Sequence, residues 1–188
     1  MSFIARIPVT PALGTYRLHQ HIFNIAGADA VYARLGGYAL VVAPKRPQAD
    51  EIKAYNPKIA VGEVLRFDLF ASVERRKEQK GYDPVAKLHF DQGTPWKDAA
   101  RIVAEQWLQQ KQEPNGFVMQ ELAEVTYEPV ACVRKKDRAT IRHAAIRMNG
   151  ILEVTDEARF CSALLKGIGR GKAWGLGLVL VRRLKRAS

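Results

Sequence analysis

The residues best suited to proton transfer are a tyrosine and a histidine three positions apart, Tyr16 and His19. They lie in the segment 16–26, whose apolar residues recur with helical spacing, at Leu18, Ile22, Ile25 and Ala26. Because side chains three apart are neighbours on a helix, the pair shares one edge of this apolar face. A histidine so placed can exchange protons near neutral pH, and the pair can orient a reacting hydroxyl. A purely structural role for the pair is the alternative.

The other three histidines, His21, His89 and His143, form no metal motif with His19. No His-Glu-x-x-His sequence is present, and His19 and His21 are two apart, which points them to different faces of a helix. The two cysteines, Cys132 and Cys161, have no Cys-x-x-Cys spacing, and reduced, buried thiols in a cytoplasmic protein are expected. We therefore predict no metal site and no cofactor.

A second candidate for chemistry is the run from Gly167 to Gly177, where five glycines alternate with two cations and one tryptophan. Glycine accepts a positive φ and leaves backbone N–H groups exposed, so such a loop can line a concavity for a phosphate or a polyanion. Gly169 and Gly171 would allow close backbone approach, and Arg170 and Lys172 would supply positive charge. A glycine-rich turn packed against another part of the protein is the alternative.

The two common nucleotide-binding motifs do not fit this loop. A P-loop reads G-x-x-x-x-G-K-[ST], but Lys166 stands five positions before Gly171 and Ala173 follows the lysine. The G-x-G-x-x-G pattern fails because Lys172 stands in place of its last glycine. Both motifs also run from strand to helix, whereas here a helix is predicted before the loop and a strand after it. A nucleotide-using enzyme is therefore disfavoured.

Positive charge is concentrated in the last third of the chain. Residues 130–188 hold 14 Lys and Arg against 4 Asp and Glu, while residues 1–129 hold 16 against 15. Concentrated cations attract polyanions, so nucleic acid is the predicted partner, with a merely solvated surface as the alternative. A cluster is expected at a hairpin tip and along the strand that follows it: Arg134, Lys135, Lys136, Arg138, Arg142 and Arg147.

The elements that would position these residues fall into two similar series. The first has strands at 3–9, at 31–43 with a break at Gly36-Gly37, and at 64–74, together with the helix 16–26 and a weak helix at 49–55. The second has helices at 96–111 and 157–166, strands within 117–133 and 140–155, and a last strand at 176–181. The polar stretch 74–81 reads as a linker. This order predicts an α+β fold with two tandem ferredoxin-like domains, residues 1–80 and 84–188.

The sequence predicts a protein that stays in the cytoplasm. The chain has 188 residues, and no apolar stretch approaches the ~20 residues of a membrane span. The N-terminus lacks a basic region followed by an apolar core, so no secretory signal is expected. We predict a cytoplasmic protein without a membrane partner.

Two motifs together resemble the CasE endoribonucleases: Tyr16-x-x-His19 on the first helix, and Gly167-Ile168-Gly169-x-x-Lys172-x-x-Gly175-x-Gly177-Leu178 before the last strand. The resemblance extends over nearly the whole chain. It implies two RRM-like domains of the RAMP superfamily and metal-independent cleavage of CRISPR precursor RNA just 3′ of a repeat stem-loop. The implied products are a 2′,3′-cyclic phosphate and a 5′-OH, and the implied partners are the repeat stem-loop RNA and the other Cascade subunits.

The same resemblance assigns roles to residues. His19 would be the general acid or base, and Tyr16 its partner. Gln20 and Asn24 stand where some relatives have basic residues, so Arg17 and Lys172 are the candidates for charge stabilisation. Because duplex RNA is recognised mostly through its shape and phosphates, the basic hairpin would bind the stem. The alternative function is a non-catalytic RNA-binding module of the same fold, which would need neither Tyr16 nor His19.

Overall fold

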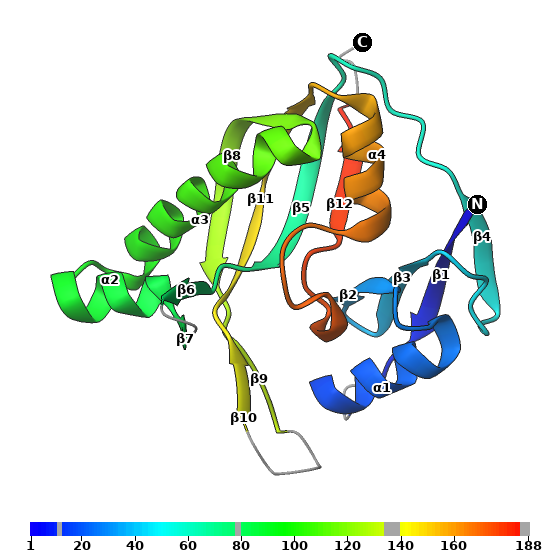
Figure 1. Cartoon of the computed structure of the whole chain (residues 1–188), viewed down its shortest axis with the longest axis horizontal. Coiled ribbons are helices and arrows are strands. Elements are labelled where there is room, and N and C mark those ends of the chain that lie inside the picture. The colour runs from blue at the N-terminus through cyan, green and yellow to red at the C-terminus, as the bar shows by residue number, and fades with distance from the viewer. Residues whose placement is uncertain (11–12, 78–79, 134–139, 185–188) are drawn as a thin grey trace.

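The first half of the chain forms a four-stranded antiparallel sheet with one helix on it (Figure 1). The computed structural model describes residues 1–10, 13–77, 80–133 and 140–184. The strands follow the order β2-β3-β1-β4. Their bounds are β1 Ser2–Pro8, β2 Val31–Leu35, β3 Tyr38–Ala43 and β4 Glu51–Tyr55. The helix α1 (Thr15–Ala26) buries Leu18, Ile22 and Ala26 against the sheet, as its apolar spacing predicted.

The break predicted at Gly36-Gly37 is confirmed, because Gly36 has a φ of +61° in the turn that joins β2 to β3. The weak helix predicted at 49–55 is wrong. Its residues form the edge strand β4, in which half-buried Ile52 lies between exposed Glu51 and Lys53 and pairs with Ala5 of β1. Five residues are too few for the spacing of apolar side chains to distinguish a strand from one helical turn. Pairing with β1 makes this segment a strand.

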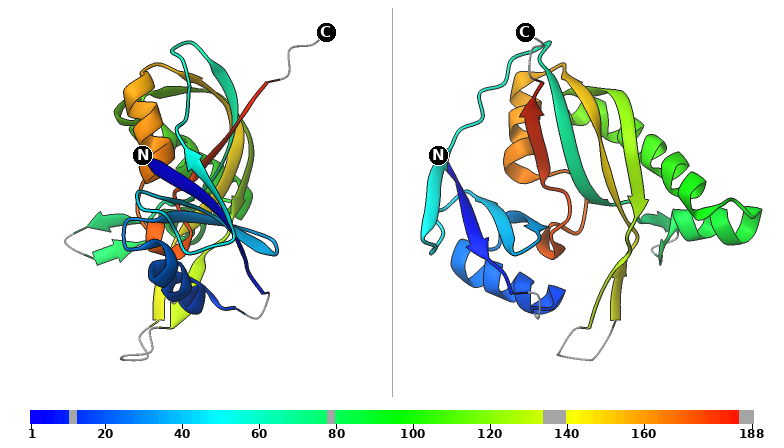
Figure 2. Two further views of the ribbon diagram at one scale, coloured as in Figure 1. Left: turned by 90° about the vertical axis from the view of Figure 1, so that its right-hand side faces the viewer. Right: turned by 180° about the vertical axis from the view of Figure 1, so that it is seen from behind.

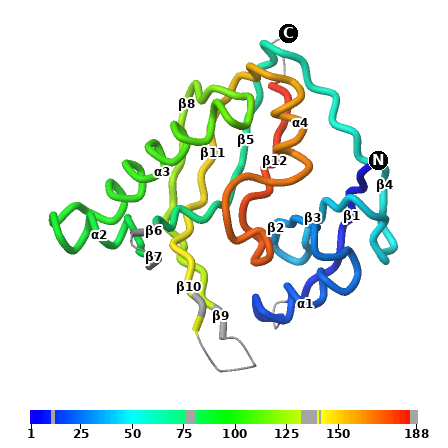
Figure 3. Tube along the Cα trace, viewed as in Figure 1, coloured from blue at the N-terminus to red at the C-terminus, as the bar shows by residue number. Residues whose placement is uncertain are grey.

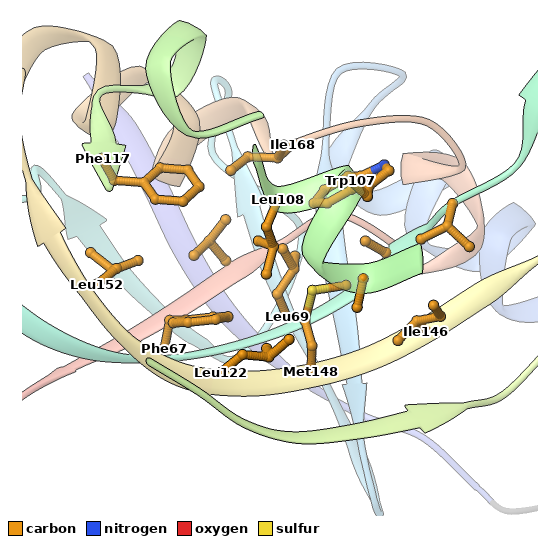
Figure 4. Close-up of a cluster of buried hydrophobic side chains, with 14 of the residues drawn as sticks. Phe67, Leu69, Trp107, Leu108, Phe117, Leu122, Ile146, Met148, Leu152 and Ile168 are labelled. Atoms are coloured by element: carbon orange, nitrogen blue, oxygen red, sulfur yellow. The ribbon is translucent and has the colours of Figure 1, made fainter. Parts of the chain in front are cut away.

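The second half forms another four-stranded antiparallel sheet, with the order β12-β5-β11-β8. Its strands are β5 Val64–Ser72, β8 Phe117–Tyr127, β11 Ala145–Val154 and β12 Val179–Arg183. Helices α3 (Trp96–Gln112) and α4 (Glu157–Lys166) share one buried core with this sheet. Figure 4 shows the centre of that core, where Trp107 and Leu108 of α3 lie over Leu69, Ile146 and Met148 of the sheet.

The strand predicted at 64–74 is present as β5, but it lies in the second sheet, between β12 and β11. Its apolar residues Leu65, Phe67 and Leu69 are buried in the core beneath α3. The two sheets therefore divide between Tyr55 and Val64, whereas the order of elements had placed this strand with the first series. The polar stretch read as a linker contains two short paired strands, β6 (Arg75–Lys77) and β7 (Lys80–Tyr82).

Two further strands form a hairpin that extends beyond the second sheet. β9 (Val130–Val133) follows β8, and β10 (Thr140–His143) precedes β11; they pair from Thr140 opposite Val133 to His143 opposite Val130. The hairpin runs down toward α1, and α1 contacts β9 (Figures 1 and 2). The remaining elements are α2 (Pro84–Gln92) and the short helices η1 (Glu113–Asn115) and η2 (Lys172–Trp174).

A small apolar cluster joins the two halves. Val31, Ala33 and Val42 of the first sheet pack with Leu178, the residue that precedes β12. Figure 3 traces the connection from α4 to β12, which passes beside β2. Within the described ranges, no helix has the length and apolar character that crossing a membrane requires.

Candidate functional site

Tyr16 and His19 lie at one edge of the buried face of α1, as their spacing predicted. Both are half-buried, whereas Arg17 between them is exposed. Their rings meet Trp174 of η2: the centroid of the His19 ring lies 4.8 Å from that of Trp174, and the centroid of Tyr16 lies 6.1 Å from it in a stacked arrangement. The structure therefore brings the predicted proton-transfer pair and the glycine loop into one place.

The glycine loop, which we define as residues 167–177, is closed at its base by its own backbone. Ile168 N donates to Gly177 O at 2.7 Å, and Gly177 N donates to Phe70 O of β5 at 2.7 Å. A Cβ at Gly177 would lie 2.4 Å from Ile168 O, and one at Gly167 would lie 2.8 Å from Gly177 O. The chain needs glycine at these two positions because the two sides of the loop pass each other backbone to backbone.

The other three glycines of the loop also face protein. All have a positive φ, and an added Cβ would lie 3.0 Å from the Trp107 ring at Gly169, 2.7 Å from Leu176 at Gly171, and 2.9 Å from the Tyr32 ring at Gly175. The Tyr32 hydroxyl donates to Ala173 O at 3.0 Å, which fixes the loop to β2. Internal packing thus accounts for the glycines, and RNA contact at Gly169 and Gly171 stays a prediction.

The two cations of the glycine loop face different hollows. Arg170 is exposed, and its backbone forms an isolated antiparallel β-bridge with Ser72 of β5. Arg170 also lines a hollow of about 340 Å³ together with Arg75, Lys111 and Trp107. Lys172 is half-buried and lines a separate hollow of about 520 Å³. Burial, and after it the charge of Lys166, lowers the pKa of Lys172 below its ordinary value of 10.5. The two cations therefore line separate hollows and do not share one site.

A third ring, that of a second histidine to which the sequence analysis gave no role, lies against Trp174 from the second half of the chain. His143, the last residue of β10, lies 6.4 Å from Trp174 between ring centroids. Its Nδ1 lies 3.4 Å from a carboxylate oxygen of Glu74. Only the pairing of distant segments brings His143 here, since Val73 N donates to Ala144 O at 2.8 Å. Nothing in the local sequence around His143 signals this contact.

The predicted basic cluster is described only in part. Arg134, Lys135, Lys136 and Arg138 lie outside the described residues. Arg142 is exposed on β10, whereas Arg147 belongs to the next strand, β11. The guanidinium of Arg147 lies 3.3 Å from Glu128, 3.9 Å from Asp68 and 4.6 Å from the centre of the Phe70 ring. Arg142 is thus available to a partner, while much of the charge of Arg147 is compensated within the protein.

No set of three or more His, Cys, Asp or Glu residues could hold a metal ion among residues 1–10, 13–77, 80–133 and 140–184. Cys161 is a free, half-buried thiol whose Sγ donates to Pro57 O at 3.4 Å. Burial, with a smaller effect of Glu157, raises its pKa.

Comparisons with known proteins agree with this arrangement. Residues 18–183 match the family described as CRISPR associated protein. A Thermus thermophilus protein named CRISPR-associated endoribonuclease Cse3 is 31% identical over 157 residues, which span 77% of this chain and 64% of that relative. This chain therefore covers less than two thirds of the relative's length in that match.

Two solved structures share the fold over nearly the whole chain. One is Thermus thermophilus Cse3 bound to an RNA that represents a pre-cleavage complex, with a TM-score of 0.72, 22% identity and coverage of 96% of this chain and 98% of that chain. The other is a chain of a CRISPR RNA-guided surveillance complex, with a TM-score of 0.69, 20% identity and coverage of 97% and 100%. The α+β class is confirmed. Because the family match takes in most of the sequence, including His19 and the whole glycine loop, the chain belongs to the family of CRISPR-associated proteins.

Proposed function

We propose that the chain is an endoribonuclease that cleaves CRISPR precursor RNA at repeat stem-loops. One observation carries the proposal: His19, half-buried next to Tyr16, is in ring contact with Trp174 of the cationic glycine loop. The name of the Thermus thermophilus relative, an endoribonuclease, and the RNA bound in its structure support the same activity. A half-buried histidine beside a cationic glycine loop suits proton transfer during cleavage of an RNA strand.

The reaction that fits these residues needs no metal ion. The 2′-oxygen attacks the adjacent phosphorus, the bond from phosphorus to the 5′-oxygen breaks, and a 2′,3′-cyclic phosphate and a 5′-OH result. One proton leaves the 2′-hydroxyl, and another reaches the departing 5′-oxygen. His19 makes one of these transfers, Tyr16 orients the reacting hydroxyl, and a general acid or base contributes ~10²- to 10⁴-fold to the rate.

Cations on both sides of the pair would hold the phosphates. Arg17 is exposed on α1 between Tyr16 and His19, and Lys172 lies two residues before Trp174 in the glycine loop. Arg170 shares its hollow with Arg75 and Lys111, which sequence reasoning missed because they come from β6 and α3. These positions support a path for the RNA backbone along the loop, with Arg142 and the rest of the hairpin on the stem.

We also infer that the second half is ferredoxin-like and that the first half is a reduced form of the same fold. In the second half, the order β5, α3, β8, β11, α4, β12 is the strand-helix-strand-strand-helix-strand order of that fold. The first half departs from it, because β4 follows β3 without a second helix. After cleavage the protein would stay on the guide RNA together with the other Cascade subunits, a proposal supported by the chain of similar fold in a surveillance complex.

The decisive assay incubates the protein with a labelled repeat stem-loop RNA in excess EDTA. We expect a single cut that leaves a cyclic phosphate and a 5′-OH. A strict requirement for Mg²⁺ would contradict the proposed reaction. Binding of the stem-loop without any cleavage would instead favour the non-catalytic RNA-binding module.

Replacing His19 by Ala tests the assigned role. We expect cleavage to slow by at least ~10²-fold, with the dissociation constant of the RNA nearly unchanged, because the role is proton transfer. His21→Ala is the matched control, since His21 is exposed on the same helix and makes no contact with the Trp174 ring. Equal losses of binding and cleavage in His19→Ala would make His19 a structural residue.

A further inference from the structure

Trp174 is the point at which the two halves of the chain meet through aromatic rings. Tyr16 and His19 contact it from α1, and His143 contacts it from β10, at the end of the hairpin. All three centroid distances, from 4.8 to 6.4 Å, fall in the range of favourable aromatic pairs. His143 and His19 therefore lie against the same ring, that of Trp174.

The backbone around His143 is tied to β5 and its extension. Val73 N donates to Ala144 O at 2.8 Å, which sets His143 beside Glu74. Arg170 of the glycine loop bridges to Ser72 of the same segment. The segment 72–74 thus fixes both the root of the hairpin and the loop that carries Trp174.

The His143 imidazole is costly to keep at this place. Both of its ring nitrogens are buried, and neither has a hydrogen-bond partner among the described residues; a carboxylate oxygen of Glu74 lies 3.4 Å from Nδ1. A buried polar group without a hydrogen bond is rare in folded proteins and calls for an explanation. The neighbours that this imidazole has are the Trp174 ring, 6.4 Å away between centroids, and the carboxylate of Glu74.

We propose that His143 is a positioning residue, which holds Trp174 against His19 and thereby couples the basic hairpin to the proton-transfer pair. The inference rests on the proposed ribonuclease function. Arg142, the neighbour of His143, is exposed and available to the RNA. A stem bound along the hairpin would therefore contact β10, the same strand that carries His143. Binding of the stem and alignment of His19 for proton transfer would then occur together.

The test compares His143→Ala, His143→Phe and wild type in single-turnover cleavage of the repeat stem-loop, with the RNA dissociation constant measured in parallel. Because a misplacement of about 1 Å far from the reacting atoms can cost ~10²-fold in rate, we expect His143→Ala to cleave ~10- to 10²-fold more slowly while binding RNA as wild type does. His143→Phe keeps a ring against Trp174 and should restore most of the rate. His89→Ala is the control, because His89 stacks on Trp96, 4.1 Å away, and not on Trp174.

A second readout is independent of RNA. The NMR resonances of the His19 ring protons, identified by their loss in His19→Ala, should shift in His143→Ala, since the Trp174 ring beside them moves, and should not shift in His89→Ala. If His143→Ala does not fold, His143→Phe and His143→Gln decide: an active Phe variant with an impaired Gln variant supports the ring contact, and the reverse overturns it.

The outcomes separate the two proposals. A wild-type protein that binds the stem-loop but never cuts it refutes the ribonuclease function, while the His19 resonances still decide whether His143 positions the site. A wild-type enzyme whose cleavage rate and His19 resonances are unchanged in His143→Ala refutes the positioning role alone. Equal losses of RNA binding and cleavage in His143→Ala also overturn it.

Discussion

At the scale of single residues, Lys172 differs from Arg170, its neighbour in the glycine loop, because it is half-buried and lies near a like charge. Both burial and Lys166 lower its pKa in the folded chain, so the unfolded chain binds more protons between that lowered value and 10.5. The destabilisation of the folded chain by Lys172 is therefore full below the lowered pKa and vanishes as the pH rises past 10.5.

Lys172→Met should remove this cost. We expect the variant to be more stable than wild type at pH 7, and the difference between the two proteins to shrink as the pH approaches 10.5, as measured by urea unfolding at several pH values. RNA affinity should fall, because the variant lacks a cation next to the site. Parallel stability curves for the two proteins would mean that Lys172 is as well solvated when folded as when unfolded.

Residue spacing predicted Tyr16 and His19 but not the rings that meet them. Three positions on a helix are a local relation, which the sequence carries in full. The approach of His143 to Trp174 depends on the hydrogen bond from Val73 to Ala144, which joins segments about seventy positions apart along the chain. A spacing rule relates only residues close in sequence, so the sequence analysis gave His143 no role.

At the scale of elements, three of the helices were predictable, whereas α2 was missed, the helix 49–55 was wrong and the sheet membership of β5 was not predicted. The helix 157–166 was placed to the residue, because Asp156 caps it and Gly167 ends it. For β5, the same alternation of buried and exposed residues suits either sheet, and only pairing with β11 and β12 assigns it. The glycine loop was located correctly; three of its glycines face Trp107, Leu176 and Tyr32, which agrees with the packed alternative, and RNA contact at Gly169 and Gly171 stays a prediction.

A matched pair of glycines separates backbone strain from packing in the glycine loop. Gly171 (φ 75°, ψ 17°) and Gly93 (φ 68°, ψ 13°) have almost the same left-handed conformation. A Cβ at Gly93 would meet nothing within 4 Å, whereas one at Gly171 would lie 2.7 Å from the Cδ1 atom of buried Leu176. Gly93→Ala should lower the free energy of unfolding by about 1–2 kcal/mol. Gly171→Ala should lower it by more, since Leu176 must also move.

Urea unfolding of the two variants, followed by RNA binding of the folded protein, gives the measurement. Equal costs in the two variants would mean that Leu176 moves aside freely. If Gly171→Ala kept its stability relative to Gly93→Ala but bound RNA more weakly, then close approach of the RNA backbone at Gly171 would be the reason for the glycine.

At the scale of the whole molecule, α1 contacts both the hairpin strand β9 and the short helix η2 of the glycine loop (Figures 1 and 2). Arg17, Arg142 and Arg170 are exposed on three separate elements, α1, β10 and the glycine loop. The sequence predicted that the excess charge belongs to the last third of the chain. It could not predict that Arg147 is held by Glu128 and Asp68, because Glu128 comes from the residue just after β8 and Asp68 from β5.

Salt dependence of RNA binding measures how much of this charge meets phosphates. Removing one cation that neutralises a phosphate lowers the slope of log K against log salt concentration by roughly 0.7 to 0.9, so Arg142→Ala should flatten it by about that amount. Replacing Arg134, Lys135, Lys136 and Arg138 together should flatten it further. Arg147→Ala should change the slope less, because its guanidinium lies beside two carboxylates, and lower the stability of the sheet instead. If the slope is unchanged after the hairpin cations are removed, these cations belong to solvated surface. If Arg147→Ala lowers the slope as much as Arg142→Ala does, RNA displaces Glu128 and Asp68 from Arg147.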